Sequence, residues 1–319
     1  MGVCSLTKVL VTGGAGFIGS NLVDLLIQGG NDVHVIDDLS TGLREFLNPE
    51  ATFIESDLLD DSFDVAKACE GVTTVYHLAA NADVKDGWLH PDKDLHQNVR
   101  ATLRVAEACR LAGVADLVFT STGSVYGEAK IFPTPETEPF PRQTSLYGAS
   151  KVAAEGFLEA YAEAGFFGVT IFRLVSSLGP RYTHGHVIDF VRQLTSHPDR
   201  LMVLGNGFQE KSYFHVSDCV RALTSLRGQS GANVFNIGRP DTTTVRESIA
   251  VITQALGVSP DVQFGDANQG WIGDNPRILL DTARAQAAGW VPQWGLREAI
   301  EDTVRYLVDN PHLMATASA

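Results

Sequence analysis

Three side chains whose types suit acid–base chemistry stand at two places in the chain. Tyr147 and Lys151 are four residues apart in S-L-Y-G-A-S-K, at the start of an expected helix, so they share one face of it. Thr122 ends the polar run Thr120-Ser121-Thr122, which follows an apolar strand. A nearby cation favours a tyrosinate, and a hydroxyl can hold a substrate oxygen. The three residues therefore predict a proton-transfer site.

The elements that must position this site alternate between strand and helix through the first half. Expected strands cover 9–11, 33–36, 52–55, 74–78, 117–120 and 170–173, and expected helices lie near 20–28, 62–69, 94–112 and 148–164. This alternation is typical of an α/β protein with a doubly wound parallel sheet. Ligands of such sheets bind at the carboxyl ends of the strands, where the polar run and the start of the last helix are expected to meet.

A glycine-rich turn joins the first strand to the first helix. The stretch Lys8 to Ser20 reads K-V-L-V-T-G-G-A-G-F-I-G-S, in which Gly13 and Gly16 leave room for a tight turn and a pyrophosphate, and Gly19 lets the helix pack closely. Asp37 ends the second strand, where a carboxylate can bind ribose hydroxyls and repel a 2′-phosphate. The pattern predicts a Rossmann-type site for NAD rather than NADP.

The pattern loosens from about Gly179, where loops rich in Gly, Pro, His and Asn separate short helices. We expect residues 1–178 to form mainly the NAD-binding Rossmann domain and residues 179–319 mainly a smaller, discontinuous α/β substrate-binding domain. The stretches 174–177 and 234–237 have strand-like composition. A segment near 212–240 is therefore expected to return to the Rossmann domain.

Composition excludes several classes of partner. The 319 residues are 44% hydrophobic, and the net charge of -14 disfavours non-specific binding to nucleic acid or to anionic membranes. No apolar run is long enough to span a membrane, and no secretory signal precedes the first strand. Cys4, Cys69, Cys109 and Cys219 lack metal-site spacing, so we expect reduced packing thiols, no metal and a cytoplasmic setting.

Four motifs together resemble the extended short-chain dehydrogenase/reductase family of nucleotide-sugar epimerases and dehydratases: T-G-G-A-G-F-I-G, H-L-A-A, S-T-G-S-V-Y-G and Y-G-A-S-K. The likeness covers nearly the whole chain. It implies that Tyr147 takes a proton from a sugar hydroxyl, that Lys151 holds the nicotinamide ribose and tunes Tyr147, and that Thr122 binds the sugar oxygen, with Ser124 as a further catalytic residue. The NAD contacts that it implies are Gly13, Gly16, Phe17, Ile18, Gly19, Asp37, Asp57, Leu58, Leu78, Ala79, Ala80, Asn98, Tyr147 and Lys151.

The same resemblance implies a UDP-sugar substrate. In G-N-G-F-Q-E-K-S-Y-F-H-V-S-D, Lys211 stands where relatives usually carry an arginine on the nucleotide diphosphate, and Arg277 in D-N-P-R-I-L-L-D matches their second arginine. A lysine lacks the bidentate geometry of an arginine, so its hold on phosphate is weaker. The expected substrate contacts are Lys85, Thr122, Ser124, Tyr126, Ser176, Val203, Lys211 and Arg277.

Two departures from the family pattern concern the reaction. Ser176 stands where epimerases of this family place an asparagine, and Gly123-Ser124 replaces the Asp-Glu pair of 4,6-dehydratases. The loss of that acid and base favours 4-epimerisation, in which a hydride leaves C4 for NAD and returns to the other face. The chain as a whole, however, resembles the UDP-N-acetylglucosamine 5,6-dehydratase type of the tunicamycin pathway. There the C4 ketone would acidify the C5 proton, and the 6-hydroxyl would leave as water.

We prefer the UDP-N-acetylglucosamine 5,6-dehydratase interpretation and keep a UDP-hexose or UDP-N-acetylhexosamine 4-epimerase as the alternative. The residue that would remove the C5 proton stays open among Lys85, Asp83, Ser124 and Tyr126. A silent NAD-sensing regulator is disfavoured by the intact acid–base set, and a reductase would consume its cofactor stoichiometrically. The family also implies a homodimer, in which helices near 94–112 and 148–164 pair with their counterparts in a four-helix bundle.

Overall fold

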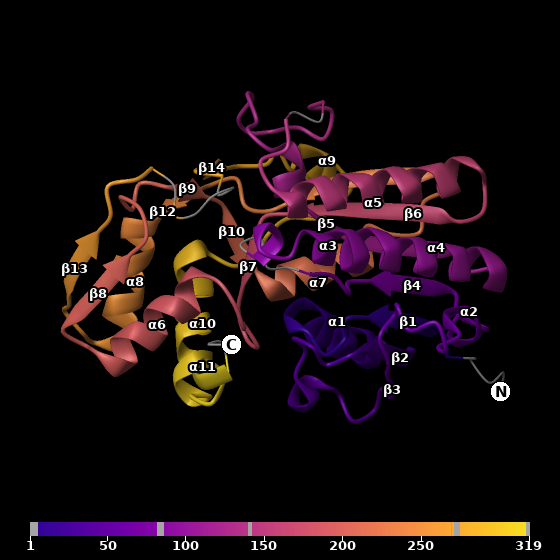
Figure 1. Cartoon of the computed structure of the whole chain (residues 1–319), viewed down its shortest axis with the longest axis horizontal. Coiled ribbons are helices and arrows are strands. Elements are labelled where there is room, and N and C mark those ends of the chain that lie inside the picture. The colour runs from indigo at the N-terminus through magenta and orange to yellow at the C-terminus, as the bar shows by residue number, and fades with distance from the viewer. Residues whose placement is uncertain (1–5, 82–85, 140–141, 269, 271–274, 317–319) are drawn as a thin grey trace.

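The computed structural model describes residues 6–81, 86–139, 142–268, 270 and 275–316. Its larger lobe is built on a seven-stranded, wholly parallel sheet with the order β11-β6-β5-β4-β1-β2-β3 (Figure 1). The strands are β1 (Lys8–Thr12), β2 (Asp32–Asp37), β3 (Thr52–Glu55), β4 (Thr74–His77), β5 (Asp116–Thr122), β6 (Gly168–Leu174) and β11 (Ala232–Ile237). The strand order reverses between β1 and β4, so the predicted doubly wound α/β fold is confirmed and its ligand crevice lies at that switch point.

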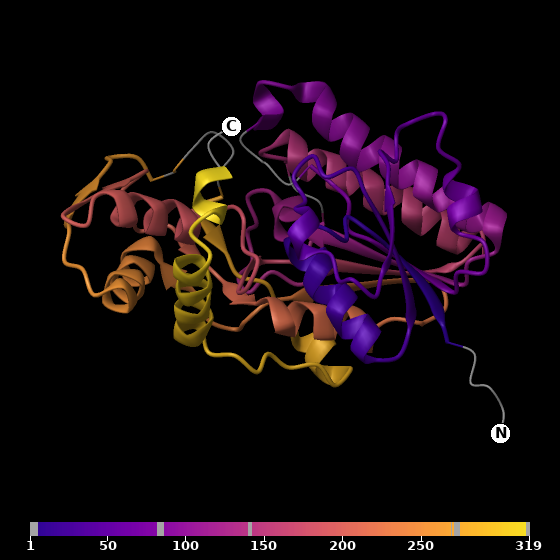
Figure 2. The same ribbon diagram turned by 90° about the horizontal axis from the view of Figure 1, so that it is seen from below.

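Helices cover both faces of this sheet, which explains why its central strands are continuous apolar runs. One face carries α1 (Phe17–Gln28) and α7 (Val216–Ser225), and the other carries α2 (Val65–Ala68), α4 (Ala101–Ala112) and α5 (Leu146–Glu163) (Figure 2). Val9 and Val11 of β1 belong to the cluster under α1 and α7, whereas Leu10 belongs to the cluster under α4 and α5. All three side chains are fully buried.

The smaller lobe, at the left of Figure 1, contains helices that pack beside two small sheets. Its elements are α6 (His186–Ser196), α8 (Val245–Leu256), α10 (Leu296–Asp309), α11 (Leu313–Thr316), β8 (Arg200–Val203), β13 (Asp261–Phe264), β9 (Glu210–Lys211), β12 (Thr243–Thr244) and β14 (Arg277–Ile278). The chain re-enters the larger lobe between these elements, because α7 covers the sheet and β11 pairs with β6. None of the helices in the described ranges is long and apolar enough to cross a membrane.

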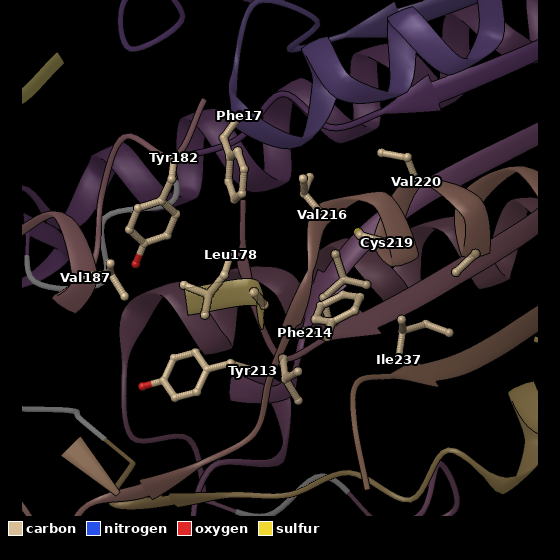
Figure 3. Close-up of a cluster of buried hydrophobic side chains, with 14 of the residues drawn as sticks. Phe17, Leu178, Tyr182, Val187, Tyr213, Phe214, Val216, Cys219, Val220 and Ile237 are labelled. Atoms are coloured by element: carbon tan, nitrogen blue, oxygen red, sulfur yellow. The ribbon is translucent and has the colours of Figure 1, made fainter. Parts of the chain in front are cut away.

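One hydrophobic cluster runs from the large sheet into the smaller lobe (Figure 3). Phe17 at the start of α1 packs edge-on against Tyr182, with 5.5 Å between ring centroids. Leu178 of β7 (Ser176–Leu178) and Phe214 of β10 (Tyr213–His215) lie on parallel paired strands within the same cluster. This shared core packs the two lobes against each other.

The helix expected over 94–112 is interrupted. The structure has α3 (Pro91–Asp94), then a π-helical turn η3 (Leu95–Arg100), and then α4. The wider turn contains Asn98, whose side chain is buried and bonded to a neighbouring helix and loop. Single π-helical turns within α-helices frequently lie at functional sites. The wider turn lies where Asn98 bonds to the loop after β4 and to α5.

Candidate active site

The three predicted acid–base residues meet at the carboxyl end of β5. Ser145 caps the start of α5 by accepting a hydrogen bond from the Gly148 N–H at 3.0 Å, which places Tyr147 and Lys151 in the first two turns. A hydrogen bond joins the side chains of Thr122 and Tyr147. The structure therefore brings together the three residues that the sequence predicts to converge.

Lys151 is held in a fixed position one turn further along α5. Its side chain is only 2% exposed, and its Nζ donates a hydrogen bond to the Thr120 carbonyl at 3.0 Å. The same Nζ lies 4.6 Å from the centroid of the Phe119 ring, at cation–π distance. A lysine packed in this way contributes a fixed positive charge close to Tyr147 rather than a mobile surface cation.

Burial shifts the proton affinities of both residues. It raises the pKa of Tyr147 to about 12, against the hydrogen bond with Thr122 and in the same direction as the charge of Asp94. Burial also lowers the pKa of Lys151 to about 8, while the carboxylates of Glu155 and Asp94 oppose that shift. Lys151 is therefore largely protonated at neutral pH, and a further positive charge near Tyr147 would favour the tyrosinate.

The glycine loop has the close contacts that a dinucleotide cradle requires. A Cβ on Gly19 would lie 2.0 Å from the Gly13 carbonyl oxygen, and a Cβ on Gly13 would lie 2.7 Å from the Ala79 nitrogen. Gly13 also has a φ of +72°, which only glycine adopts easily. Helix α1 begins directly after this loop with no acidic residue in its first turn, so its N-terminus suits an anion.

Asp37 is positioned by the same loop. Its Oδ2 accepts a hydrogen bond from the Ala15 N–H at 2.9 Å, and its Oδ1 accepts one from the Leu39 N–H at 2.9 Å. Burial raises the pKa of Asp37, and these two backbone bonds oppose the shift. The carboxylate is thus oriented at the end of β2, beside the glycine turn, where the adenosine ribose of a dinucleotide is bound in this fold. The residues present fit NAD.

Other residues predicted for the NAD site divide into two groups. Ala79 follows β4 and donates its N–H to Thr12 Oγ1 at 3.3 Å, so Leu78, Ala79 and Ala80 adjoin the glycine loop. Asp57 is exposed after β3, and its Oδ1 accepts the Leu59 N–H at 2.8 Å.

The side chains of Phe17 and Leu58, by contrast, are buried in the two hydrophobic clusters, and Ile18 packs partly buried against the first. A ligand could therefore meet Phe17 and Leu58 chiefly through their backbone. The predicted roles of these residues remain predictions.

Asn98 is fully engaged inside the protein. Its Oδ1 accepts the Asn81 backbone N–H at 2.9 Å, and its Nδ2 donates to Ser150 Oγ at 2.9 Å. Ser150 in turn donates its hydroxyl to the Tyr147 carbonyl at 2.8 Å. Asn98 thus links the loop after β4 to helix α5, which carries Tyr147, and its predicted contact with NAD remains a prediction.

The predicted substrate residues of the 122–126 segment face in different directions. Ser124 is partly exposed in the turn η4 (Gly123–Tyr126), and its backbone N–H donates to Thr122 Oγ1 at 3.1 Å. Tyr126 is 1% exposed, and its hydroxyl donates to Asn236 Oδ1 at 2.8 Å and accepts from Arg173 Nη1 at 2.7 Å. Sequence spacing could not show this direction, and it removes Tyr126 from the set that can touch a sugar or act as the C5 base.

Lys211 and Arg277 do not converge as the sequence suggests. In the β9–β14 pair, Lys211 stands opposite Ile278 and Arg277 stands opposite Glu210, so the two cations leave opposite faces of the small sheet. The Ile278 side chain adjoins Gly123 of the turn η4, because a Cβ on Gly123 would lie 3.3 Å from Ile278 Cγ2. Lys211 therefore lies on the face of the small sheet that contacts η4.

Arg277 points the other way. Its Nε lies 3.7 Å from Glu210 Oε2, and its guanidinium stacks over the Phe132 ring at 4.6 Å. Of the other predicted substrate residues, Ser176 is exposed at the start of β7, whereas Val203 of β8 is 5% exposed. Lys85 and Asp83 lie outside the described residues.

One residue near the acid–base pair, Asp94, was missed by sequence reasoning. Asp94 is 1% exposed and accepts hydrogen bonds from the side chains of Asn81 and Asn98. The only signal in the sequence was the i, i+4 spacing of Asp94 and Asn98 on an expected helix. His77 is a different case, because burial lowers its pKa to about 3 and both ring nitrogens contact threonine hydroxyls. It is a neutral structural histidine.

Comparison with known proteins identifies the family. The model of the "NAD dependent epimerase/dehydratase family" matches residues 9–238. The chain belongs to the NAD-dependent epimerase/dehydratase family. The UDP-glucose 4-epimerase of Mycolicibacterium smegmatis is 35% identical over 310 residues, which cover 94% of this chain and 98% of that protein.

Solved structures agree with this membership of the family. A UDP-glucose 4-epimerase from Thermotoga maritima with UDP-glucose has a TM-score of 0.87 and 32% identity, with coverage of 96% of this chain and 100% of that one. MoeE5 in complex with UDP-glucuronic acid and NAD has a TM-score of 0.85 and 33% identity, with coverage of 95% and 99%. This family member is therefore an NAD-dependent enzyme of nucleotide-sugar chemistry. Its relatives fit the 4-epimerase alternative better than the preferred 5,6-dehydratase interpretation.

Proposed function

We propose that this enzyme binds a UDP-sugar and epimerises it at C4 through a transient 4-keto sugar. The observation that carries the proposal is the convergence of Tyr147, Lys151 and Thr122 at the carboxyl end of β5, which only β4 separates from β1 and its glycine loop. Proton transfer at a sugar hydroxyl and hydride transfer at the adjoining carbon require these two sites side by side.

The side chains have distinct roles in this proposal. Tyr147, as the tyrosinate, takes the proton of the C4 hydroxyl, and the Lys151 cation stabilises that tyrosinate. Thr122 holds the same sugar oxygen by a hydrogen bond. NAD, when bound, supplies the acceptor for the C4 hydride and gives it back. When the hydride returns to the opposite face, Tyr147 returns its proton to the C4 oxygen, so the enzyme ends each turnover unchanged.

Binding of the nucleotide diphosphate is assigned to Lys211. Its side chain leaves the small sheet on the face next to η4, and its positive charge acts on His186 at the start of α6. Arg277 is assigned no direct phosphate contact, because it leaves the opposite face beside Glu210. One lysine holds a diphosphate less rigidly than two arginines would, because it offers no planar pair of donors.

A second candidate is the 5,6-dehydration of UDP-N-acetylglucosamine. Ser176 favours it, because epimerases of this family are expected to carry an asparagine there, and the whole chain resembles the 5,6-dehydratase type. After the same C4 oxidation, the C5 proton and the 6-hydroxyl would leave as water, and the hydride would return to C4. Ser124 is the described residue of the turn η4 that could take part in this proton transfer.

The mass of the product separates the two reactions. The enzyme is incubated with NAD and, in separate reactions, with UDP-glucose and UDP-N-acetylglucosamine, and the products are analysed by mass spectrometry and NMR. Unchanged mass with inverted C4 supports epimerisation, whereas loss of one water establishes dehydration and overturns it. Net formation of reduced nicotinamide would contradict both reactions, because each returns the hydride within one turnover.

We also infer a homodimer formed through α4 and α5. These helices lie side by side on one face of the large lobe (Figure 2), and several of their large apolar side chains are exposed. The exposed side chains on and near these helices are Leu95, Leu103, Leu111, Phe157 and Phe166. Pairing two such faces would remove this apolar surface from water, which favours association.

A further inference from the structure

A buried carboxylate lies beside the acid–base pair and has no role in the proposed proton transfer. Asp94 ends α3, directly before the π-helical turn, and its side chain is 1% exposed. Its Oδ1 accepts hydrogen bonds from Asn81 Nδ2 at 2.9 Å and from Asn98 Nδ2 at 3.2 Å. Its Oδ2 packs against Gly87, because a Cβ there would lie 2.5 Å from that oxygen. Burying a carboxylate costs folding free energy unless hydrogen bonds or an opposite charge compensate for the lost water.

The hydrogen bonds around Asp94 define the orientation of the Asn98 amide. The backbone N–H of Asn81 can only donate, so the Asn98 atom that faces it must be the oxygen. The Asn98 NH2 group then faces Asp94 and Ser150, and both can accept. Because Ser150 bonds to the Tyr147 carbonyl, the series of contacts ends at the backbone of the proposed base.

We propose that Asp94 is a positioning residue of the acid–base site, which holds the catalytic helix through Asn98 and sets the charge balance of Tyr147 and Lys151. The proposal rests on the proposed function for the roles of Tyr147 and Lys151. It goes beyond that function because Asp94 neither touches the reacting atoms nor belongs to any motif that identified the family.

Few charged groups act on Tyr147 and Lys151 within the described ranges, so the electrostatic effect of Asp94 can be identified. Asp94 acts on both Tyr147 and Lys151, and its negative charge favours the protonated form of each. Within the described ranges, the other group acting on Lys151 is Glu155 on α5, which is itself paired with Arg173 of β6. His77 at the end of β4 is neutral and adds no charge. Asp94 is thus the carboxylate that reaches both members of the pair.

Two variants separate the charge of Asp94 from its hydrogen bonds. Asp94→Asn keeps an oxygen that can accept from Asn81 and Asn98 but removes the charge, whereas Asp94→Ala removes both. In Asp94→Asn the proton affinities of Tyr147 and Lys151 should both fall. The tyrosinate titration of Tyr147 should move down by on the order of half a pH unit or more. It is followed by ultraviolet difference absorbance in the NAD-bound protein, with Tyr147→Phe used to assign the signal.

This titration does not depend on turnover, so it tests Asp94 even if the proposed reaction is wrong. Where product forms, both limbs of the pH profile of kcat/KM should also shift to lower pH in Asp94→Asn. Asp94→Ala should in addition lose up to about a hundredfold in kcat, because the catalytic helix is less well positioned. An unshifted Tyr147 titration in a folded Asp94→Asn protein would overturn the proposal and leave Asp94 as a packing residue only.

Discussion

At the scale of single residues, the site depends on a contrast between the pKa values of two side chains. Tyr147 holds its proton too tightly to act as a base by itself, because burial raises its pKa to about 12. Lys151, one turn further along α5, is buried, yet it keeps most of its charge at neutral pH with the help of Glu155 and Asp94. The protein therefore supplies part of the positive charge that a tyrosinate needs, and a cationic nicotinamide ring would supply more.

Replacing the proposed base should stop catalysis without disturbing the fold. Tyr147→Phe removes only the phenolic oxygen, so the loss in kcat should be about 10²–10⁴-fold, the usual contribution of a positioned acid–base group. Affinity for NAD, measured by fluorescence titration, should change little. Turnover equal to that of the unmodified enzyme would exclude Tyr147 as the base.

The pH profile of kcat/KM should reflect the lowered pKa of Lys151. Its pKa lies near 8 in the folded protein, below the value of about 10.4 for an unperturbed lysine. The cation is therefore present below pH 8 and lost as the pH rises through 8, and the profile of kcat/KM should turn downward there. A profile that keeps rising through pH 10 would contradict a role for the lysine charge.

At the scale of elements, α5 is fixed to the sheet by a buried ion pair behind the site. Arg173 of β6 donates its Nη2 to Glu155 Oε2 at 2.7 Å, and both side chains are almost fully buried. Ser121 of β5 donates its hydroxyl to Glu155, and Arg173 also donates to the Tyr126 hydroxyl at 2.7 Å. These contacts join helix α5 to the strand that carries Thr122, so the relative position of Tyr147 and Thr122 depends on them.

Breaking this ion pair from one side should be costly. Glu155→Ala leaves the Arg173 guanidinium buried without its partner, and the free energy of unfolding should fall by about 3–5 kcal/mol. The double variant Glu155→Leu/Arg173→Met should recover most of that loss, because no buried charge remains. Urea unfolding measures both changes, and equal destabilisation by the single and double variants would argue against this account.

The glycine turn offers a second test at this scale. Gly19→Ala places a Cβ 2.0 Å from the Gly13 carbonyl oxygen, so the turn must deform and NAD affinity should fall sharply. Gly71→Ala is the matched control, because Gly71 has a φ of +69° but no atom within 4 Å of the new Cβ. It should cost about 1–2 kcal/mol of stability and leave NAD affinity unchanged. Both quantities are measured by calorimetry.

At the scale of the whole molecule, one hydrophobic core joins the two lobes. Side chains of α1, β7, β10 and α7 form one cluster, so the smaller lobe cannot shift freely against the NAD-binding sheet (Figure 3). Lys211 belongs to the smaller lobe and shares the face of its sheet that contacts η4, whereas Tyr147 and Thr122 belong to the larger lobe. The division of the chain near residue 178 remains a prediction, whereas β11 lies within the large sheet beside β6.

The proposed homodimer is tested by changing its apolar face. Phe157→Asp introduces a charge on the exposed face of α5, where the aromatic side chain is 43% exposed, and should convert dimer to monomer. Val308→Asp on α10 is the control, because this side chain is also apolar and exposed but lies on the other lobe. Analytical ultracentrifugation measures both variants. A monomeric unmodified protein at working concentration would refute the dimer.

The sequence by itself determined the features that depend on local spacing. Gly13, Gly16 and Gly19 are fixed by the geometry of one turn, and Tyr147 and Lys151 share a helix face because they are four residues apart. The fold class followed from the same local patterns, since alternating strands and helices can bury their apolar surfaces in few ways.

The tertiary structure decided what depends on segments far apart in the chain. Strand register places Lys211 and Arg277 on opposite faces of the small sheet. Hydrogen bonds to Arg173 and Asn236 hold the Tyr126 side chain inside the protein. Asp94 lies close enough to act on Tyr147 because the π-helical turn that follows it packs against α5. The physical reason is that direction and burial arise from long-range packing, whereas spacing along one turn or helix is set by the chain itself.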